Sequence, residues 1–288
     1  MAYSVPYPRS LSPHLPAEAR SAKAGFTLLE LSMVLVIIGL IVGGILVGQD
    51  MIKAAEIRST ISQLEKYKSA VNTFRIKYNS LPGDMIPANA AAYGFTARAG
   101  SYGRGDGDGF IEGDETLLFW SDLSMANLVD GSFTAAIDTG NTTYPAAALP
   151  TLLPTAKLSQ NAYIVAIVEY GANMSGPLTI NSFVIAGLAD LTVDTSSKVT
   201  DPGLTFGANS VLDVMTPRQA FAIDQKIDDG WPRSGRVWSQ EDPGGTNGLR
   251  YSGTGNDNCI NTSFLPWIYN TTPSFIDHAG CRLMVGFQ

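Results

Sequence analysis

The feature that most constrains this chain is a long apolar run near its N-terminus. Residues 26–47 read FTLLELSMVLVIIGLIVGGILV, and Glu30 is the only charged residue among them. A helix needs about 20 residues to cross the hydrocarbon core of a membrane, so this run is long enough to span one. The preceding segment, residues 1–25, is polar and basic, which predicts that it stays on the cytoplasmic side.

Three simpler interpretations of the run compete with a specialised one. A secretory signal peptide has a shorter apolar run and a small-residue cleavage site after it, whereas here Ala24 and Gly25 precede the run. A plain membrane anchor accounts for the length but not for Glu30. A buried core helix is rarely apolar on every side. Because an ionisable group in a membrane segment costs a few kcal/mol, Glu30 indicates a function and requires a partner.

The segment KAGFTLLELSMVLVIIGLIVGGIL, residues 23–46, resembles the N-terminus of type IV pilins and type II secretion pseudopilins. In that family a membrane peptidase cuts after the glycine and methylates the new N-terminus. The resemblance places the cut after Gly25, makes Phe26 the N-methylated first residue, and identifies Glu30 as the acidic residue of the motif. It also implies a pilin-like fold, in which a long N-terminal helix packs on an antiparallel sheet.

Cleavage at this position would place two opposite charges close together. It exposes the amine of Phe26, and the carboxylate of Glu30 lies about one helical turn further on. The two groups can neutralise each other in apolar surroundings, either within one subunit or between neighbours. Pairing between subunits would set the axial register of an assembly, and pairing within one subunit is the alternative.

Beyond the apolar run, residues 49–80 predict a helix with two chemically different faces. The chain has no proline between Phe26 and Pro82. Apolar residues recur at i, i+3, i+4 and i+7, with charged residues between them. This stripe consists of Met51, Ile52, Ala55, Ile57, Ile61, Leu64, Tyr67, Val71, Phe74, Ile76 and Tyr78. We expect one helix from Phe26 to about Asn79, about 80 Å long, which packs through the stripe on a sheet and is ended by Leu-Pro-Gly-Asp at 81–84.

The rest of the chain predicts a globular body that contains an antiparallel sheet. Residues 162–170 and 182–189 are rich in Val, Ile and aromatic side chains, and the Gly- and Pro-containing segment 171–177 joins them as a hairpin. Residues 281–287 predict a last strand. The Gly- and Asn-rich segment 241–258 predicts a loop.

Two helices are expected within this body. One covers residues 116–129, with Asp114 as its N-cap. The other covers residues 216–230, where Thr216 and Gln219 form a capping box around Pro217. The chain is therefore expected to be α+β, with four parts: a leader at 1–25, a transmembrane helix at 26–48, an amphipathic helix at 49–80 and a globular body at 81–288.

A glycine-rich acidic segment, GSYGRGDGDGFIEGDE at residues 100–115, resembles the calcium-loop pattern D-x-[DN]-x-[DN]-G-x5-E. The expected ligands are the carboxylates of Asp106, Asp108 and Glu115, the carbonyl of Phe110, and Glu112 through water. Arg104 departs from the pattern, because it stands where the first Asp belongs. Two interpretations stay open: a weak calcium site, favoured by analogy with pseudopilins that hold body loops with calcium, or a solvated acidic turn.

The two cysteines, Cys259 and Cys281, lie near the C-terminus. They form no C-x-x-C pair and have no histidine cluster nearby, which argues against zinc. If the body lies outside the cytoplasm, we expect a disulfide between them. The alternative is two reduced thiols in the core.

Charge and motif content argue against nucleic-acid binding and against catalysis. The formal net charge is −7, and no basic stripe with interleaved aromatic residues is present, so binding to nucleic acid has no electrostatic support. His14 lies in the leader, which leaves His278 as the one histidine after cleavage. The sequence has no P-loop, no H-E-x-x-H and no G-x-S-x-G. We therefore expect that this protein is not an enzyme.

The expected function is a structural subunit of a type IV pilus or a type II secretion pseudopilus. The resemblance implies prepilin peptidase, other pilin or pseudopilin subunits and the inner-membrane assembly machinery as partners, with the body in the periplasm. The 263 residues left after cleavage (288 − 25) are long for a shaft subunit and favour a minor or specialised role. The alternative is a membrane-anchored extracytoplasmic binding protein or hydrolase that uses a signal anchor.

Overall fold

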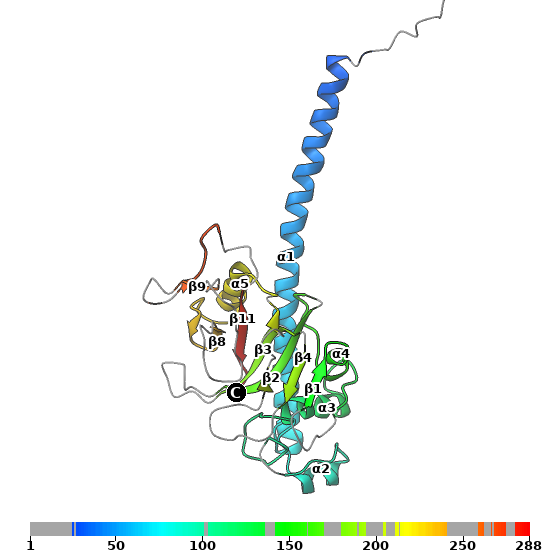
Figure 1. The fold of residues 1–288 in the computed structure, drawn as a ribbon, viewed down its shortest axis with the longest axis vertical. Coiled ribbons are helices and arrows are strands. Elements are labelled where there is room, and N and C mark those ends of the chain that lie inside the picture. Colours follow the sequence, from blue (N-terminus) through cyan, green and yellow to red (C-terminus); the bar gives the residue numbers. More distant parts are fainter. Residues whose placement is uncertain are drawn as a thin grey trace, which may run out of the picture. The chain divides into compact units, whose positions relative to one another are not determined.

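The structure, a computed structural model, describes the following residues: 25, 27–100, 103–135, 142–159, 161–169, 180–188, 190–193, 204–205, 211–212, 214–240, 259–261, 266, 268–274 and 280–288. The chain forms two compact units, Met1–Asp50 and Met51–Gln288. Helix α1, Leu28–Tyr78, contributes its first part to one unit and the remainder to the other (Figure 1). The helix begins two positions after the expected start at Phe26, which itself lies outside the described residues.

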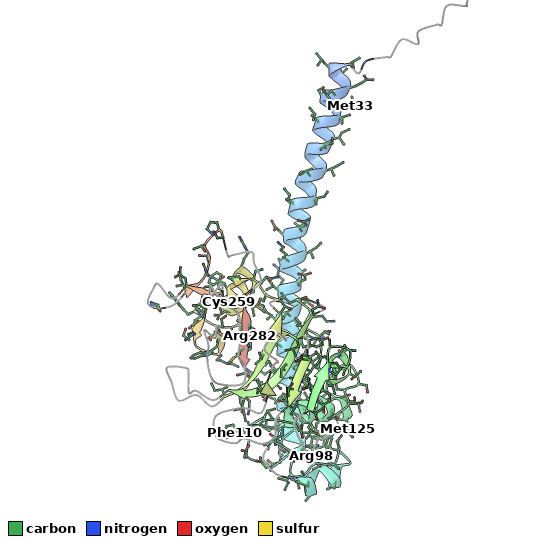
Figure 2. All side chains as sticks on the ribbon, in the orientation of Figure 1. Met33, Arg98, Phe110, Met125, Cys259 and Arg282 are labelled. Atoms are coloured by element: carbon green, nitrogen blue, oxygen red, sulfur yellow. A yellow bond between two sulfur atoms is a disulfide. The ribbon has the colours of Figure 1, made fainter. Side chains whose placement is uncertain are left out.

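The first unit contains the apolar part of α1. Its side chains are exposed along the whole segment, for example 87% at Leu28 and 73% at Leu40. Figure 2 shows them projecting from the ribbon, Met33 among them. By length and composition α1 can cross a membrane. A bare apolar surface of this kind is stable in lipid or against other apolar helices.

In the second unit, α1 buries one face against the body. Its buried residues are Ile57, Thr60, Leu64, Tyr67, Ala70, Val71, Phe74 and Tyr78, spaced three and four apart. Not all of the predicted stripe is buried. Met51 and Ile52 are exposed, and Ile76 is 86% exposed, because it lies two positions from both Phe74 and Tyr78 and so faces away from them.

Helix α1 ends at Tyr78, close to the expected position. Asn79 has a left-handed backbone with φ 53°, and its N–H still donates to the carbonyl of Arg75 at 2.9 Å. Asparagine tolerates this conformation and commonly ends helices. The helix therefore ends three positions before Leu81, the first residue of the Leu-Pro-Gly-Asp sequence that was expected to end it.

The main sheet of the body is antiparallel throughout. Its strand order is β2-β3-β11-β8-β7, and β6 also pairs with β3. The strands are β2 (Ala162–Glu169), β3 (Ile180–Leu188), β6 (Val211–Leu212), β7 (Arg233–Ser234), β8 (Val237–Gln240) and β11 (Arg282–Gly286). The predicted strand pair is confirmed, with Val165 opposite Val184, and so is the last strand. The α+β class is therefore confirmed.

The described residues also form two smaller sheets. One has the order β1-β4-β5 and the other pairs β10 with β9. Their bounds are β1 (Thr142–Pro145), β4 (Asp190–Val193), β5 (Leu204–Thr205), β9 (Ile260–Asn261) and β10 (Ile268–Tyr269). The segments expected to be loops at 171–177 and 241–258 lie outside the described residues.

Among the described residues, the body has four shorter helices: α2 (Pro87–Tyr93), α3 (Glu115–Met125), α4 (Leu149–Leu152) and α5 (Pro217–Ile227). The capping box of α5 is confirmed, since the Thr216 side chain accepts from Gln219 N and the Gln219 side chain accepts from Thr216 N. Asp114 occupies the N-cap position of α3, as predicted, but its side chain makes no cap hydrogen bond. Backbone carbonyls take its place: Glu115 N donates to Gly103 O and to Glu112 O.

The core lies where α1 and α3 pack on one face of the main sheet (Figure 1). The ring of Tyr67, from α1, lies 4.9 Å from that of Trp120, from α3. Both contact Phe183 of β3, at centroid distances of 6.1 and 6.0 Å, and Phe183 contacts Phe287 at 4.4 Å. Aromatic residues that are far apart in sequence thus join the helices to the sheet.

A disulfide joins Cys259 and Cys281 in the structure, with their Cα atoms 5.0 Å apart. Both cysteines are fully buried. The backbone of Cys281 also forms an isolated antiparallel β-bridge with Met215, just before α5. The disulfide therefore ties the segment that enters β9 to the segment that enters β11, as the sequence predicted for a body outside the cytoplasm.

Candidate functional site

The first turn of α1 is closed by a reciprocal pair of hydrogen bonds between Thr27 and Glu30. Glu30 N donates to Thr27 Oγ1 at 3.2 Å, while Thr27 N and Thr27 Oγ1 donate to Glu30 Oε2 at 2.9 and 3.0 Å. This is a capping box, which satisfies helix N–H groups that have no partner within the helix. Sequence reasoning missed it, although Thr-x-x-Glu is the pattern that predicts one.

The capping box gives Glu30 a partner inside its own chain. In apolar surroundings, donors from Thr27 lower the cost of burying the carboxylate. Gly25, on the near side of the predicted cut, is exposed, and no heavy atom of the described residues beyond its chain neighbours lies within 4 Å of the position where a side chain would begin. Phe26 lies outside the described residues, so its pairing with Glu30 stays a prediction.

The fold and this N-terminal segment define an α+β protein in which a long apolar helix precedes an antiparallel sheet body, as in a membrane-anchored pilin. Residues 20–46 match the family model of the prokaryotic N-terminal methylation motif. This motif is the signature of type IV pilins and pseudopilins, and the match covers the N-terminal segment of this chain. No curated protein and no solved structure matches the chain.

The acidic segment of the body folds around carboxylates of the same chain. Its glycines alternate with other residues, and Gly103, Gly105, Gly107 and Gly109 all have left-handed backbones, with φ between 63° and 91°. Alternation of this kind turns successive N–H groups toward one side and makes an anion-binding concavity. The Gly-x-Gly-x-Gly-x-Gly spacing thus favours a backbone whose N–H groups can donate hydrogen bonds to carboxylates.

Two buried carboxylates occupy this concavity. Glu115 Oε1 accepts from Gly105 N at 2.7 Å, and its Oε2 accepts from Glu112 N at 3.1 Å. Asp84 accepts from Gly107 N at 2.7 Å through Oδ1 and from Gly109 N at 2.8 Å through Oδ2. Asp84, in the segment after α1, was not predicted as a site residue, and no local sequence signal connects it to a loop more than twenty residues away.

Burial opposes ionisation of both carboxyl groups. It raises the pKa of Glu115 to about 9, and the charge of nearby Asp84 adds to the rise, against the effect of the backbone N–H bonds. Burial also raises the pKa of Asp84 to about 7, again against its N–H bonds. Two adjacent buried carboxyls cannot both be charged cheaply, so the pair favours a bound proton or a nearby cation.

Three carboxylates of this loop region lie close enough together to coordinate one metal ion. One oxygen each from Asp84, Asp106 and Asp108 lies within 4.8 Å of the others. Of the expected calcium ligands, this cluster includes Asp106 and Asp108. In the part of the chain that the structure describes, Glu112 and Glu115 do not join it; the Glu115 carboxylate instead accepts the backbone N–H groups of Gly105 and Glu112.

The remaining loop residues have defined places. Phe110, half-buried, donates its N–H to Asp108 Oδ1 at 2.9 Å, and Figure 2 labels it. Arg104, where the calcium pattern has Asp, forms an ion pair with Asp114 at 3.3 Å. This pair explains why Asp114 does not cap α3: its side chain is turned to the arginine.

A buried ion pair fastens the acidic loop to the body. Arg98 Nη2 and Nη1 donate to Asp122 Oδ1 and Oδ2 at 2.8 and 3.1 Å, and both side chains are fully buried. Asp122 Oδ2 also accepts from Gly83 N at 2.8 Å, next to Asp84. The pair therefore fixes the start of the loop region to α3. His278, the histidine that remains after cleavage, lies outside the described residues.

Proposed function

We propose that this chain is a structural subunit of a type IV pilus or type II secretion pseudopilus, incorporated through its N-terminal helix. The observation that carries the proposal is the match of residues 20–46 to the methylation motif, at the start of a helix that can cross a membrane. Prepilin peptidase removes residues 1–25 and methylates Phe26. Segment 26–48 then holds the subunit in the inner membrane, and 49–80 joins it to a periplasmic body, 81–288.

In this proposal Glu30 acts in assembly. Within one chain its carboxylate is held by Thr27, so it enters the apolar phase with partners already in place. The amine of a neighbouring Phe26 then adds an ion pair, which is strong in a medium of low dielectric constant. The other partners are the assembly machinery of the inner membrane and further pilin or pseudopilin subunits.

The decisive experiment measures the mature N-terminus. Mass spectrometry of the membrane-extracted protein should give a chain that begins at Phe26 and carries one extra methyl group. An intact Met1, or cleavage after Val47, contradicts the proposal and favours the alternative, an anchored binding protein or hydrolase.

Three variants separate the two roles of Glu30. Glu30→Ala should be cleaved normally and should not enter filaments. Thr27→Ala removes one donor of the capping box but keeps the charge, so it should still be incorporated. Glu65→Ala, on an exposed part of the same helix, is the matched control and should behave as wild type. If Thr27→Ala and Glu30→Ala fail alike, Glu30 serves only the helix cap.

The size of the body favours a minor or specialised subunit over a shaft subunit, because 263 residues (288 − 25) remain after cleavage. The pseudopilin that typically tips the secretion filament lacks the acidic residue of the motif, so Glu30 argues against that identity. The proposed role contains no chemical step on the subunit beyond its processing. Quantification of labelled filaments tests this role: a minor subunit appears at few positions and a shaft subunit along the whole length.

We also propose that the acidic loop binds calcium weakly. Asp84, Asp106 and Asp108 present hard oxygen ligands at compatible separations, and a cation would offset the repulsion between the carboxyls of Asp84 and Glu115. Calcium should raise the melting temperature of the wild-type chain above its value in chelator. Asp106→Asn with Asp108→Asn should abolish this difference, and Glu65→Gln should keep it. Equal melting temperatures with calcium and chelator would remove the site.

A further inference from the structure

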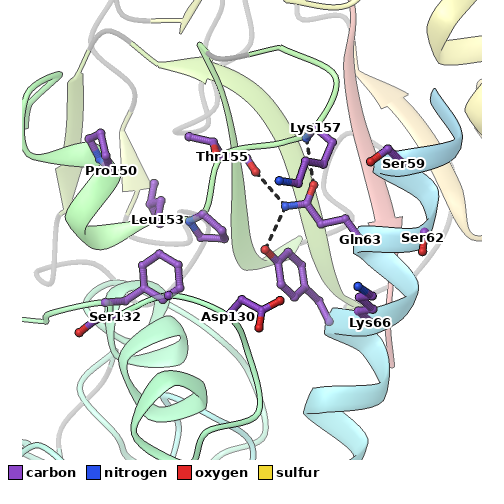
Figure 3. Close-up of a pocket in the computed structure, with 14 residues that line it drawn as sticks. Ser59, Ser62, Gln63, Lys66, Asp130, Ser132, Pro150, Leu153, Thr155 and Lys157 are labelled. Atoms are coloured by element: carbon purple, nitrogen blue, oxygen red, sulfur yellow. Dashed lines mark hydrogen bonds between the residues drawn. The ribbon is translucent and has the colours of Figure 1, made fainter. Parts of the chain in front are cut away.

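A cavity in the Met51–Gln288 unit lies against one side of α1. It has a volume of about 500 Å³ and is bounded by α1 between Ser59 and Tyr67, by residues 130–133 and by residues 150–157 (Figure 3). Ligand pockets in proteins typically measure about 300–1,000 Å³. The cavity is therefore large enough for a small molecule.

The two sides of the cavity differ in chemistry. Phe133, Pro150, Leu153 and Pro154 form an apolar side, and Figure 3 shows Pro150 and Leu153 across the space from the polar residues of α1. Those polar residues include Ser59, Ser62 and Lys66, which share one helix face because they are three and four positions apart. A ligand that fills this cavity must have an apolar face and a polar face.

The polar side is rigidly built around Gln63. Its Nε2 donates to Thr155 O at 2.8 Å and to Tyr67 Oη at 3.0 Å, and its Oε1 accepts from Lys157 N at 3.0 Å. These bonds hold α1 to the 150–157 segment (Figure 3). Because both amide hydrogens are used, Gln63 positions its neighbours and donates nothing to a ligand.

Tyr67 supplies a buried donor to the same space. Its side chain lines the cavity, and the residue is only 9% exposed. Its oxygen already accepts from Gln63, and no described residue accepts its hydroxyl hydrogen. Burial raises the pKa of Tyr67, and the charge of Asp130 adds to the rise, so the hydroxyl keeps its proton. A buried hydroxyl group that donates no hydrogen bond costs free energy, and an oxygen atom of a ligand would accept that hydrogen bond.

Three charged side chains border the cavity: Lys66, Lys157 and Asp130. All three are exposed. The ion pairs among the described residues are Arg98–Asp122 and Arg104–Asp114, so within those residues none of the three has an opposite charge within 4.0 Å. Two ammonium groups suit one carboxylate, while Asp130 accepts hydrogen bonds from hydroxyl groups. A phosphate dianion would be repelled by Asp130, and a purely apolar ligand would leave all the polar groups unused.

We propose that this cavity binds a hydroxylated carboxylate, either the acidic sugar unit of a polysaccharide or a free hydroxy acid. The carboxylate lies between Lys66 and Lys157, the hydroxyls exchange hydrogen bonds with Asp130 and Tyr67, and the C–H face of the ligand packs on the apolar side near Phe133. The inference concerns the body alone and does not depend on the filament proposal.

The test is a binding titration of the detergent-solubilised full chain with tri-galacturonate, with gluconate and with neutral glucose, followed by ligand-observed NMR and calorimetry. The proposal predicts saturable binding of at least one acid and binding of glucose at least about tenfold weaker. Preference for tri-galacturonate assigns a polysaccharide unit, and equal or tighter binding of gluconate assigns a free hydroxy acid. No saturable binding of either acid up to tens of millimolar, or equally tight binding of glucose, overturns the proposal.

Variants locate the site. Lys157→Gln and Tyr67→Phe should each weaken binding of the acid about tenfold, with melting temperatures checked to show that the body stays folded. Lys68→Gln is the matched control, since Lys68 is two positions from Lys66 on α1 and does not line this cavity. Unchanged affinity in both folded cavity variants, or an equal loss in Lys68→Gln, places the ligand elsewhere and overturns the assignment.

Discussion

Replacement of Arg98 by methionine should destabilise the body more than any surface change. The guanidinium makes two hydrogen bonds to Asp122, at 2.8 and 3.1 Å, and further bonds to Gly83 O at 3.2 Å and Thr96 O at 3.1 Å. Both charged side chains are fully buried. Arg98→Met keeps most of the aliphatic stem but leaves the Asp122 carboxylate in the core without its counter-charge.

The magnitude follows from that burial. Removal of one member of a buried pair costs about 3–5 kcal/mol, because the remaining charge is desolvated and unpaired. In a domain of this size each kcal/mol shifts the melting temperature by about 2–4 °C, so Arg98→Met should melt about 10 °C below wild type. Circular dichroism of the detergent-solubilised chain measures this. The loss should shrink at acidic pH, because a protonated Asp122 needs no counter-charge.

Two comparisons make this prediction refutable. Arg75→Met, at an exposed position in the last turn of α1, is the matched surface control and should change the melting temperature little. Arg98→Met with Asp122→Asn should recover part of the loss, because the amide oxygen still accepts from Gly83 N while the buried charge is gone. If Arg98→Met and Arg75→Met have the same melting temperature, or if the double variant is less stable than Arg98→Met alone, the reasoning is wrong.

Three further predictions concern other parts of the body. Thr216→Ala removes the cap of α5 and should cost about 1 kcal/mol in urea unfolding; Thr73→Ala, on the exposed face of α1, is the control, and an equal loss would show that the cap adds nothing. Serine at both Cys259 and Cys281 opens a loop with a sequence separation of 22 and should cost about 3 kcal/mol; wild type in reductant should match it, and an unchanged free energy of unfolding would refute the estimate. Burial raises the pKa of Asp224 to about 6, whereas an unfolded Asp releases its proton near about 3.9. Stability should therefore fall as pH rises through this range, and Asp224→Asn should flatten that part of the profile; an unchanged slope would contradict this.

The parts of the molecule with a repeating local signal were predictable from the sequence. The apolar run and the i, i+3, i+4 pattern predicted α1, and the Val- and Ile-rich segments predicted β2, β3 and β11. The capping box of α5 is a local pattern and was predicted correctly. Ile76 shows the limit of such patterns, because apolar character alone did not tell which face of α1 it occupies.

The acidic loop could not be derived in the same way. Its glycine and aspartate spacing resembles a calcium pattern, but the structure uses the glycines to receive Asp84 and Glu115. The partners Arg98 and Asp122 are also far apart in sequence, and neither carries a local signal. Contacts of this kind depend on which loops the packed helices bring together, and no local pattern in the sequence signals them.

The loop built on Gly103, Gly105, Gly107 and Gly109 has a consequence for how this surface can evolve. Its shape depends on backbone N–H groups and on two carboxylates held inside the body. The exposed side chain of Asp108 adds a local bond to Phe110 N but does not hold the loop to the body. In the absence of calcium, substitutions at such positions should therefore accumulate at small cost in stability, so related chains could diversify what this surface recognises while they keep the same loop.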